Sequence, residues 1–362
     1  MNHLNELRLL GRTAVDAEGT LWLASSAAEA AFLLRDATFL RFVLRCDDTC
    51  TDPNRQNIRP RCAVDLDGVR VLDAQLRPAS ETLLPGEETW TVFEGGPART
   101  AAVRFVKLSE CTQSILGIRA IETDGSLSPV PGRARKIEFI GDSITCGYGV
   151  EGDETQVFQT ATENAEKAWA VLTARALDAD AMLTCFSGHG LLSGYTEGER
   201  NDRELVQPYY ERVGSNSFVL PGGRRLQDIP WDFSRFRPDT VVIHLGTNDA
   251  SWVRGQPERR AQFRERYAAF LPVVRRNNPQ ARILCILGTL TEDLNEDMLQ
   301  AVAEYIRTSG DGRIRACAVP LQDRERDGIG TDGHPSPATQ RRLADRVTEL
   351  LRGWEAGAAP NA

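Results

Sequence analysis

Histidine, basic blocks and long apolar runs are all scarce in this sequence. Only four His occur among 362 residues, with no His-x-x-x-His pair and no paired carboxylate and histidine spacing, which argues against a metal-dependent hydrolase. The 43 Lys and Arg are outnumbered by 51 Asp and Glu, and the net charge of −8 is spread along the chain. Nucleic acid and anionic membranes are therefore not expected partners. No apolar run approaches the ~18 residues that a membrane-spanning helix needs.

The beginning of the chain and the cysteines suggest a compartment. Residues Met1 to Ala27 contain no basic stretch followed by an apolar one, which is the pattern of an export signal. We therefore expect a cytoplasmic protein whose eight Cys are reduced, packed thiols. Cys46 and Cys50 form the only close pair, and without a second pair or a nearby His they make a poor zinc site. We expect no metal and no other cofactor.

The first part of the chain, residues 1–128, is predicted to be an all-β domain. At roughly 150 residues per domain the chain has room for one large or two ordinary domains. Short alternating apolar runs, with turn residues such as Asp67-Gly68 between them, predict strands. These runs are 38–45, 61–72, 89–93, 101–108 and 114–121. Several short strands of this kind predict a jelly-roll-like β-sandwich.

A change of rhythm follows the stretch Thr123 to Arg135, whose two Pro and two Gly predict a linker. Residues 134–355 alternate between compact apolar runs and amphipathic segments, which predicts a layered α/β domain with a buried parallel sheet, followed by a small tail at 356–362. The expected strands are 136–140, 181–186, 240–245, 282–287 and 314–319. The expected helices are 163–179, with Thr162 as its N-cap, 257–277 and 338–351.

Four residues that suit acyl transfer follow four of these expected strands. Ser143, Gly188, Asn248 and His334 each lie in a loop after a strand. In parallel sheets such loops gather at one edge, where ligands bind. A serine, a glycine amide, an asparagine amide and a histidine that converge there are the groups that ester hydrolysis requires.

The role of each group follows from the chemistry. Ser143 is a weak nucleophile at neutral pH, so it needs a base, and His334 is the candidate. Attack on an ester carbonyl creates an oxyanion, which the N–H groups of Ser143 and Gly188 and the side-chain amide of Asn248 would stabilise. Glycine suits position 188, because a side chain there would crowd the approaching substrate oxygen.

The four blocks, FIGDSITCGYG, FSGHG, HLGTND and DGHPS, resemble those of the GDSL or SGNH hydrolase family, which centre on Ser, Gly, Asn and His in that order. A β-sandwich before the hydrolase domain, the phrase WDFSRFRPDTVVIHLGTND and the short DGHP block are similar to carbohydrate esterase family 2. The resemblance implies a flavodoxin-like SGNH hydrolase domain, with helices on both faces of its sheet. It also implies a serine esterase that removes O-acetyl groups from carbohydrates such as xylo- or manno-oligosaccharides.

The resemblance leaves the third catalytic group open. Asp332 would complete a triad if it held the ring of His334 in the right tautomer. Family members commonly place this acid three residues before the His, and here the spacing is two. Some related carbohydrate esterases work with a Ser-His dyad that backbone carbonyls orient. Gln340 stands where several relatives carry another His, and we expect it to affect only helix packing.

Other polar and aromatic residues near these blocks divide into two groups. We expect Asp142 and Asp249 to brace loops, His244 to be a hydrogen-bonded core residue, and Trp169 and Trp231 to pack in the core. Sugar rings are usually bound by aromatic faces and polar side chains. Candidates for substrate contact are His189, Trp252, Tyr148 and Tyr195.

Two other functions stay open. The family spans many acyl substrates, so a short-chain lipid or thioester hydrolase is an alternative that the fold does not exclude. A glycan-binding protein with a vestigial site is the alternative from another class. Because we expect a cytoplasmic enzyme, we expect its substrate to be imported, acetylated oligosaccharides rather than polymers.

Overall fold

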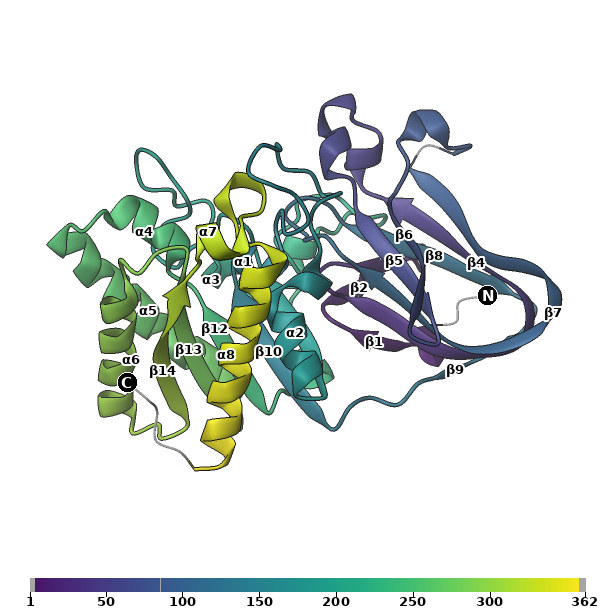
Figure 1. The fold of residues 1–362 in the computed structure, drawn as a ribbon. Coiled ribbons are helices and arrows are strands. Elements are labelled where there is room, and N and C mark those ends of the chain that lie inside the picture. The colour runs from purple at the N-terminus through teal and green to yellow at the C-terminus, as the bar shows by residue number, and fades with distance from the viewer. Residues whose placement is uncertain (1–3, 85, 358–362) are drawn as a thin grey trace.

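A computed structural model describes residues 4–84 and 86–357, so the outer part of the expected tail, residues 358–362, lies outside the described residues. The chain forms an antiparallel sheet domain followed by an α/β domain, and the two lie side by side (Figure 1). Both expected fold classes are thereby confirmed. No helix in the described part of the chain is long and apolar enough to cross a membrane.

The sheet domain consists of nine strands in one hydrogen-bonded network. Its main path has the order β2-β3-β8-β4-β7-β5-β6, and β1 and β9 pair with β4. The strands are β1 (Arg8–Leu10), β2 (Thr13–Val15), β3 (Leu21–Leu23), β4 (Glu29–Cys46), β5 (Arg61–Leu66), β6 (Val69–Gln75), β7 (Glu87–Lys107), β8 (Leu116–Thr123) and β9 (Ser126–Pro129).

Two long strands, β4 and β7, curl this sheet around its core. The first half of β4 pairs with β1 and β9, whereas its second half pairs with β8, so the strand belongs to both layers. The core between the layers includes Phe32, Phe42 and Phe105, all fully buried. The expected strands 89–93 and 101–108 are one strand, because a bulge at Gly95 and its neighbours keeps the pairing with β4. Part of the expected linker is likewise a strand, since Ser126–Pro129 pairs with β4 and its Leu127 is buried.

The second domain has a parallel sheet of the predicted flavodoxin-like type. Its order is β11-β10-β12-β13-β14, which numbers 2-1-3-4-5 within the domain. The strands are β10 (Arg135–Gly141), β11 (Ala179–Cys185), β12 (Thr240–His244), β13 (Arg282–Thr289) and β14 (Ile314–Leu321). All five coincide closely with the compact apolar runs of the sequence.

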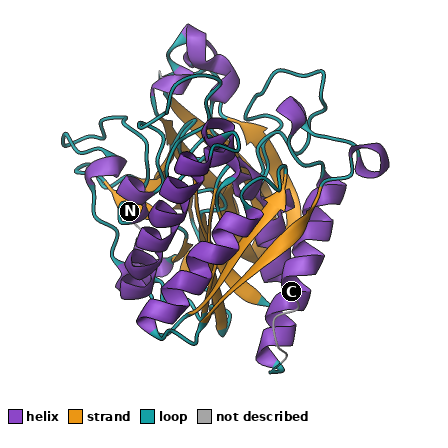
Figure 2. Ribbon diagram, turned by 90° about the vertical axis from the view of Figure 1, so that its left-hand side faces the viewer, coloured by secondary structure: helices purple, strands orange, loops and turns teal. Residues whose placement is uncertain are grey.

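Helices cover both faces of this parallel sheet (Figure 2). Neighbouring strand residues point to opposite sides, so Val241 and Ile243 pack with α5 and α6, whereas Val242 packs with α2 and α8. The helices are α1 (Ser143–Cys146), α2 (Trp169–Ala176), α3 (Gln207–Tyr210), α4 (Thr247–Val253), α5 (Pro257–Asn277), α6 (Asn295–Ser309), α7 (Arg324–Asp327) and α8 (Pro337–Glu355). Short 3-10 helices occur at Leu4–Glu6, Asp48–Cys50, Pro53–Ile58, Ala79–Glu81, Ala165–Lys167, Leu226–Asp228, Phe233–Arg235 and Thr331–Gly333.

The expected helix 163–179 is shorter than predicted. The chain makes a 3-10 turn at Ala165–Lys167, becomes extended at Ala168, and only then begins α2. Asn164 rather than Thr162 caps this turn, because its side chain accepts a hydrogen bond from the N–H of Glu166. The apolar spacing of the sequence continues through this break and therefore concealed it.

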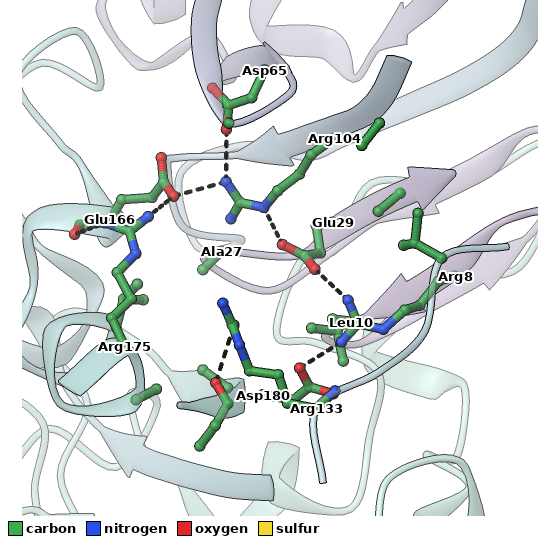
Figure 3. Close-up of a pocket in the computed structure, with 18 of the residues that line it drawn as sticks. Arg8, Leu10, Ala27, Glu29, Asp65, Arg104, Arg133, Glu166, Arg175 and Asp180 are labelled. Carbon is green, nitrogen blue, oxygen red and sulfur yellow. Dashed lines mark hydrogen bonds and ion pairs between the residues drawn. The ribbon is translucent and has the colours of Figure 1, made fainter. Parts of the chain in front are cut away.

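The two domains share an extensive polar boundary. Arg12 of the sheet domain is almost fully buried and forms an ion pair with Glu138 of β10. Beside the first residues of β11, an edge strand of the parallel sheet, a charged cavity of about 690 Å³ lies between the domains (Figure 3). There Glu166 of the α/β domain forms ion pairs with Arg70 and Arg104 of the sheet domain. The domains are therefore locked together rather than loosely tethered.

The expectation of eight reduced thiols is wrong for one pair. Cys46 and Cys50 form a disulfide, with Cα atoms 6.1 Å apart at the end of β4 and in the turn that follows it. The tight turn between Cys46 and Cys50 brings the two sulfurs together. The sequence suggested only a poor zinc site for this close pair. The other cysteines are free and buried.

Candidate active site

The register of the parallel sheet brings three of the four predicted blocks to one edge. Gly141 at the end of β10 lies beside Cys185 of β11 and His244 of β12. Because these strands end level with one another, the segments that carry Ser143 and Gly188 leave the sheet at the same place, together with α4. Figure 1 shows α1, α4 and α7 at this end of the sheet.

Ser143 and His334 are joined by a hydrogen bond. The Oγ of Ser143 lies 2.8 Å from Nε2 of His334, although 191 residues separate them in sequence. The other ring nitrogen, Nδ1, lies 3.2 Å from the main-chain oxygen of Thr331. A carbonyl oxygen at Nδ1 favours the tautomer with its proton there, which leaves Nε2 as the acceptor for the serine proton.

Asp332 has a different partner from the one that a triad requires. Its carboxylate accepts a hydrogen bond of 3.0 Å from the Tyr148 hydroxyl. Asp332 itself has a positive φ of 54°, in the short turn Thr331–Gly333, and this turn presents the Thr331 carbonyl to the histidine ring. The geometry therefore places a backbone carbonyl, the second arrangement left open by the sequence, at Nδ1.

The His334 ring is partly buried and is packed against an aromatic neighbour. The Tyr148 ring packs against it, with centroids 4.3 Å apart, and on Tyr148 in turn stacks Phe158 at 3.7 Å. Burial lowers the pKa of His334 below its ordinary value, although the Thr331 carbonyl and the charge of Asp332 act in the opposite direction. The ring is therefore neutral at neutral pH, as a general base must be.

Two of the three predicted oxyanion donors, Gly188 and Asn248, lie on segments that are tied to each other. Gly188 has a φ of 76°, a left-handed conformation that favours glycine, so backbone geometry gives a reason for this residue besides the substrate crowding we expected. The side-chain amide of Asn248 donates one N–H to the carbonyl of His189 at 2.9 Å, which ties α4 to the glycine segment. Its second N–H is not needed for that contact.

Asp142 and Asp249 have the structural roles that we predicted. Asp142 caps α1 by accepting from the N–H of Ile144 at 3.0 Å, and burial raises its pKa to about 7. Asp249 accepts hydrogen bonds from three consecutive main-chain N–H groups of the segment after Gly188. The donors are Leu191, Leu192 and Ser193. Each carboxylate thus fixes the backbone beside a reactive group.

His244, Gln340 and the two core tryptophans also lie where we expected them. His244 is fully buried, its Nε2 is 3.5 Å from the Thr289 hydroxyl, and burial lowers its pKa to about 4. Trp169 and Trp231 are buried as well. Gln340 lies between helices, where it bonds to the backbone of both α1 and α2.

The four candidate substrate residues are placed differently. Tyr148 packs against the catalytic histidine, and Tyr195 is 55% exposed, with its N–H donating to the carbonyl of Gly188. His189 is buried, and its Nδ1 lies 2.8 Å from the Ser187 carbonyl. Trp252 is partly buried, and the guanidinium of Arg259 lies 4.2 Å from its ring centroid. Of the four, Tyr195 offers the most exposed ring.

Sequence reasoning missed Glu110, a fully buried residue of the sheet domain that hydrogen-bonds to Ser187. Its carboxylate, that of Glu163 and the thiol of Cys146 place ligand-type atoms within 4.8 Å of one another, the one such group of three or more His, Cys, Asp or Glu found in the described part of the chain. The side chain of Lys107, also buried, lies close enough to interact with both carboxyls, and burial lowers its pKa. A lone Glu in a loop carries no sequence signal of such a contact.

Comparison with known proteins finds a family model that spans all four blocks. Residues 139–342 match the model of the GDSL-like Lipase/Acylhydrolase family. The chain belongs to the GDSL-like lipase/acylhydrolase family. The matched segment runs from β10 into α8 and includes Ser143, Gly188, Asn248 and His334.

Among GDSL-like relatives, the whole chain is similar to family 2 carbohydrate esterases. The cellulase/esterase CelE of Acetivibrio thermocellus is 33% identical over 336 residues, which cover 84% of this chain and 39% of CelE. An acetylxylan esterase/glucomannan deacetylase of Cellvibrio japonicus is 30% identical, over 60% of this chain and 56% of that protein. The chain thus spans well under two thirds of these relatives.

A solved structure covers both domains. The family two carbohydrate esterase from Clostridium thermocellum, in complex with cellohexaose, is 26% identical with a TM-score of 0.79. The match covers 97% of this chain and 99% of that one. The pairing of a sheet domain with a GDSL-like hydrolase domain is therefore an arrangement that this esterase shares.

Proposed function

We propose that the protein is a serine esterase that removes O-acetyl groups from acetylated carbohydrates through an acyl-Ser143 intermediate. The observation that carries the proposal is the 2.8 Å contact between Ser143 Oγ and His334 Nε2 at the strand ends. An intact nucleophile and base argue against a glycan-binding protein with a vestigial site.

The reaction proceeds in two halves. In the first, Ser143 Oγ attacks the acetyl carbonyl carbon while its proton passes to His334 Nε2. The N–H groups of Ser143 and Gly188 and the free N–H of the Asn248 amide bind the oxyanion. The intermediate then collapses, the sugar oxygen leaves with the proton from His334, and the acetyl group stays on Ser143.

In the second half, water replaces the sugar. The oxygen of the water attacks the acetyl carbon while His334 takes a proton from that water. The oxyanion that forms is again bound by the N–H groups of Ser143, Gly188 and the Asn248 amide. Collapse breaks the ester bond to Ser143, whose oxygen recovers the proton from His334, and acetic acid leaves and ionises to acetate in solution. Throughout, the Thr331 carbonyl stabilises the protonated ring by accepting its Nδ1–H.

A carbohydrate is the leaving group that the relatives support. Two relatives are named acetylxylan esterase/glucomannan deacetylase, and a structural neighbour is a carbohydrate esterase in complex with cellohexaose. In this chain, Tyr195 is an exposed aromatic beside the Gly188 segment, which suits packing against a sugar ring. We propose xylo- or manno-oligosaccharides as the substrates to test first.

The deciding assay is acetate release from acetylated xylo- and manno-oligosaccharides by the wild type and by Ser143→Ala. We expect release by the wild type and its loss in the variant, and undiminished release by Ser143→Ala would overturn the mechanism. A series of p-nitrophenyl esters separates the lipid alternative, because a deacetylase loses activity steeply beyond acetate whereas a lipase-like site does not.

The compartment is a separate proposal. We propose that the enzyme acts in the cytoplasm on imported oligosaccharides. A disulfide such as Cys46–Cys50 is more common in oxidising compartments, so the proposal needs a direct test. Fractionation of the source organism should find most of the protein inside intact cells, and recovery from the culture supernatant would overturn the proposal.

A further inference from the structure

Glu110 belongs to the sheet domain, but its carboxylate lies beneath the catalytic segments of the α/β domain. It lies in the connection between β7 and β8, and its side chain is fully buried. Its Oε2 accepts a hydrogen bond of 2.8 Å from the N–H of Ser187, and the Sγ of Cys146 donates to the same oxygen at 3.5 Å. One carboxylate oxygen therefore joins two segments of the neighbouring domain.

Both partners of Glu110 are adjacent to groups that perform the reaction. Ser187 directly precedes Gly188, whose N–H is a proposed oxyanion donor. Cys146 is the last residue of α1, the single turn that begins with Ser143. A shift of Glu110 would therefore change the position of the nucleophile relative to the oxyanion donor, and errors of about 1 Å in such positions can lower rates by ~10²-fold.

Glu110 lies among other buried ionisable side chains, Glu163 and Lys107. Burial, together with the charge of Glu110, raises the pKa of Glu163 well above its ordinary value. The N–H of Glu110 donates to Oε1 of Glu163 at 3.1 Å. Glu110 itself accepts from an N–H and an S–H donor, and the buried side chain of Lys107 lies close enough to interact with it. Burial lowers the pKa of Lys107, and the neighbouring carboxyls act in the opposite direction.

We propose that Glu110 is a positioning residue of the esterase, through which the sheet domain holds the nucleophile helix and the oxyanion segment in their reactive arrangement. This inference rests on the proposed function, because it assigns a residue to that same site. It also gives the sheet domain a role in the reaction. The sequence alone offered no evidence for such a role.

The charge of Glu110 also reaches the catalytic base. Five groups face or influence His334. They are Ser143 from α1, Tyr148 from the segment after it, Thr331 and Asp332 from the turn before the histidine, and Glu110 from the sheet domain. The negative charge of Glu110 raises the pKa of His334, against the effect of burial. Removal of that charge should therefore lower the pKa of His334, a change that a purely packing role would not produce.

The test uses three isosteric or near-isosteric variants of the full chain. Glu110→Gln removes the charge, and Glu110→Asp keeps the charge but withdraws the carboxylate by one methylene. Glu163→Gln is the matched control, because it makes the same carboxyl-to-amide change in the buried neighbour that accepts from the main-chain N–H of Glu110. For each variant we would measure thermal stability, kcat and KM on an acetyl ester against pH, and the rate at which a fluorophosphonate labels Ser143.

We expect Glu110→Gln to lower kcat by about 10- to 100-fold with KM changed less than about 3-fold, and to move the acid limb of kcat/KM to lower pH. Glu110→Asp should lower kcat as well but leave the acid limb at the wild-type pH. Glu163→Gln should resemble the wild type in its kcat and in the pH of its acid limb. If Glu110→Gln does not fold, the kcat and pH profile of Glu110→Asp decide the question.

Two results would overturn the proposal. One is wild-type kcat and labelling rate in folded Glu110→Gln, and the other is a stability loss in Glu110→Asp without any loss of kcat. Fluorophosphonate labelling reports Ser143 and its oxyanion donors whatever the acyl substrate is. If the wild type labels but releases no acetate, the proposed function has failed, and the labelling rates of the variants still test Glu110.

Discussion

The Nε2 of Gln340 donates a hydrogen bond of 3.0 Å to the main-chain oxygen of Ile144, the residue after the nucleophile. Its Oε1 accepts from the N–H of Trp169 at 2.8 Å, at the start of α2, where Ala168 supplies no side-chain cap. One amide of α8 thus holds α1 and caps α2. Helix packing, the role predicted from sequence, here includes the helix that carries Ser143.

Replacement of Gln340 should therefore affect both stability and turnover. We expect Gln340→Ala to lower the free energy of unfolding by about 2 to 4 kcal/mol, because two buried backbone groups lose their partner and a cavity forms. We also expect a fall of a few-fold in kcat. Urea unfolding and ester kinetics measure the two effects. Arg341→Ala, one residue on and exposed, is the control, and equal stability of the two variants would contradict the prediction.

Asp332 should contribute little to turnover if the Thr331 carbonyl orients His334. We expect Asp332→Asn to lower kcat/KM by less than about 10-fold, whereas loss of the orienting acid of a true triad lowers turnover by ~10⁴-fold. Steady-state kinetics on an acetyl ester give the answer. Glu325→Gln, which removes an exposed charge from nearby α7, is the control. A loss of about 10³-fold or more would instead establish Asp332 as the third catalytic residue.

The parallel sheet and the four catalytic blocks were predictable because both are local in sequence. Buried parallel strands are continuous apolar runs, and Ser143 and His334 follow such runs or lie in short Gly-rich blocks. The sheet order then brings the blocks together without further information. The Thr331 contact was not predictable, because a carbonyl is present at every position and only the positive φ of Asp332 directs this one toward His334.

The contacts that join the domains were beyond the sequence for a different reason. Glu110 and Ser187 are 77 residues apart, and Arg12 and Glu138 are 126 apart. A lone Glu or Arg in a loop gives the same sequence pattern whether its side chain is solvated or buried against another domain. The break at Ala168 was missed because the apolar spacing continues across it, although the backbone of Ala168 is extended rather than helical.

The pH dependence of kcat/KM should reflect the partly buried environment of His334. Burial lowers the pKa of this histidine below 6.5, and the base acts in its neutral form. Activity should therefore persist as pH falls through 6.5 and decline only below that value. A profile of kcat/KM from about pH 4 to about 8 tests this. An acid limb centred above pH 6.5 would contradict the prediction.

Glu166 should make the domain boundary sensitive to acid. Its carboxylate forms ion pairs with Arg104 of the sheet domain and Arg175 of α2 (Figure 3). It also forms an ion pair with Arg70 of the sheet domain. Although burial acts in the opposite direction, these guanidinium groups lower its pKa from 4.5 to about 2. In the unfolded chain the carboxyl titrates at its ordinary value, so the stabilisation is complete above pH 4.5 and is lost as pH falls toward 2.

At ~1.4 kcal/mol for each tenfold change in proton affinity, this carboxylate accounts for about 3 kcal/mol of stability at neutral pH. We therefore expect Glu166→Gln to lower the free energy of unfolding by about that amount at pH 7, and the difference from the wild type to shrink below pH 4.5. Urea titrations at several pH values measure both. Glu349→Gln, in an exposed pair with Arg346, should change stability by less than about 1 kcal/mol. A constant difference between Glu166→Gln and the wild type across the acid range would show that the carboxylate is not ionised at this boundary.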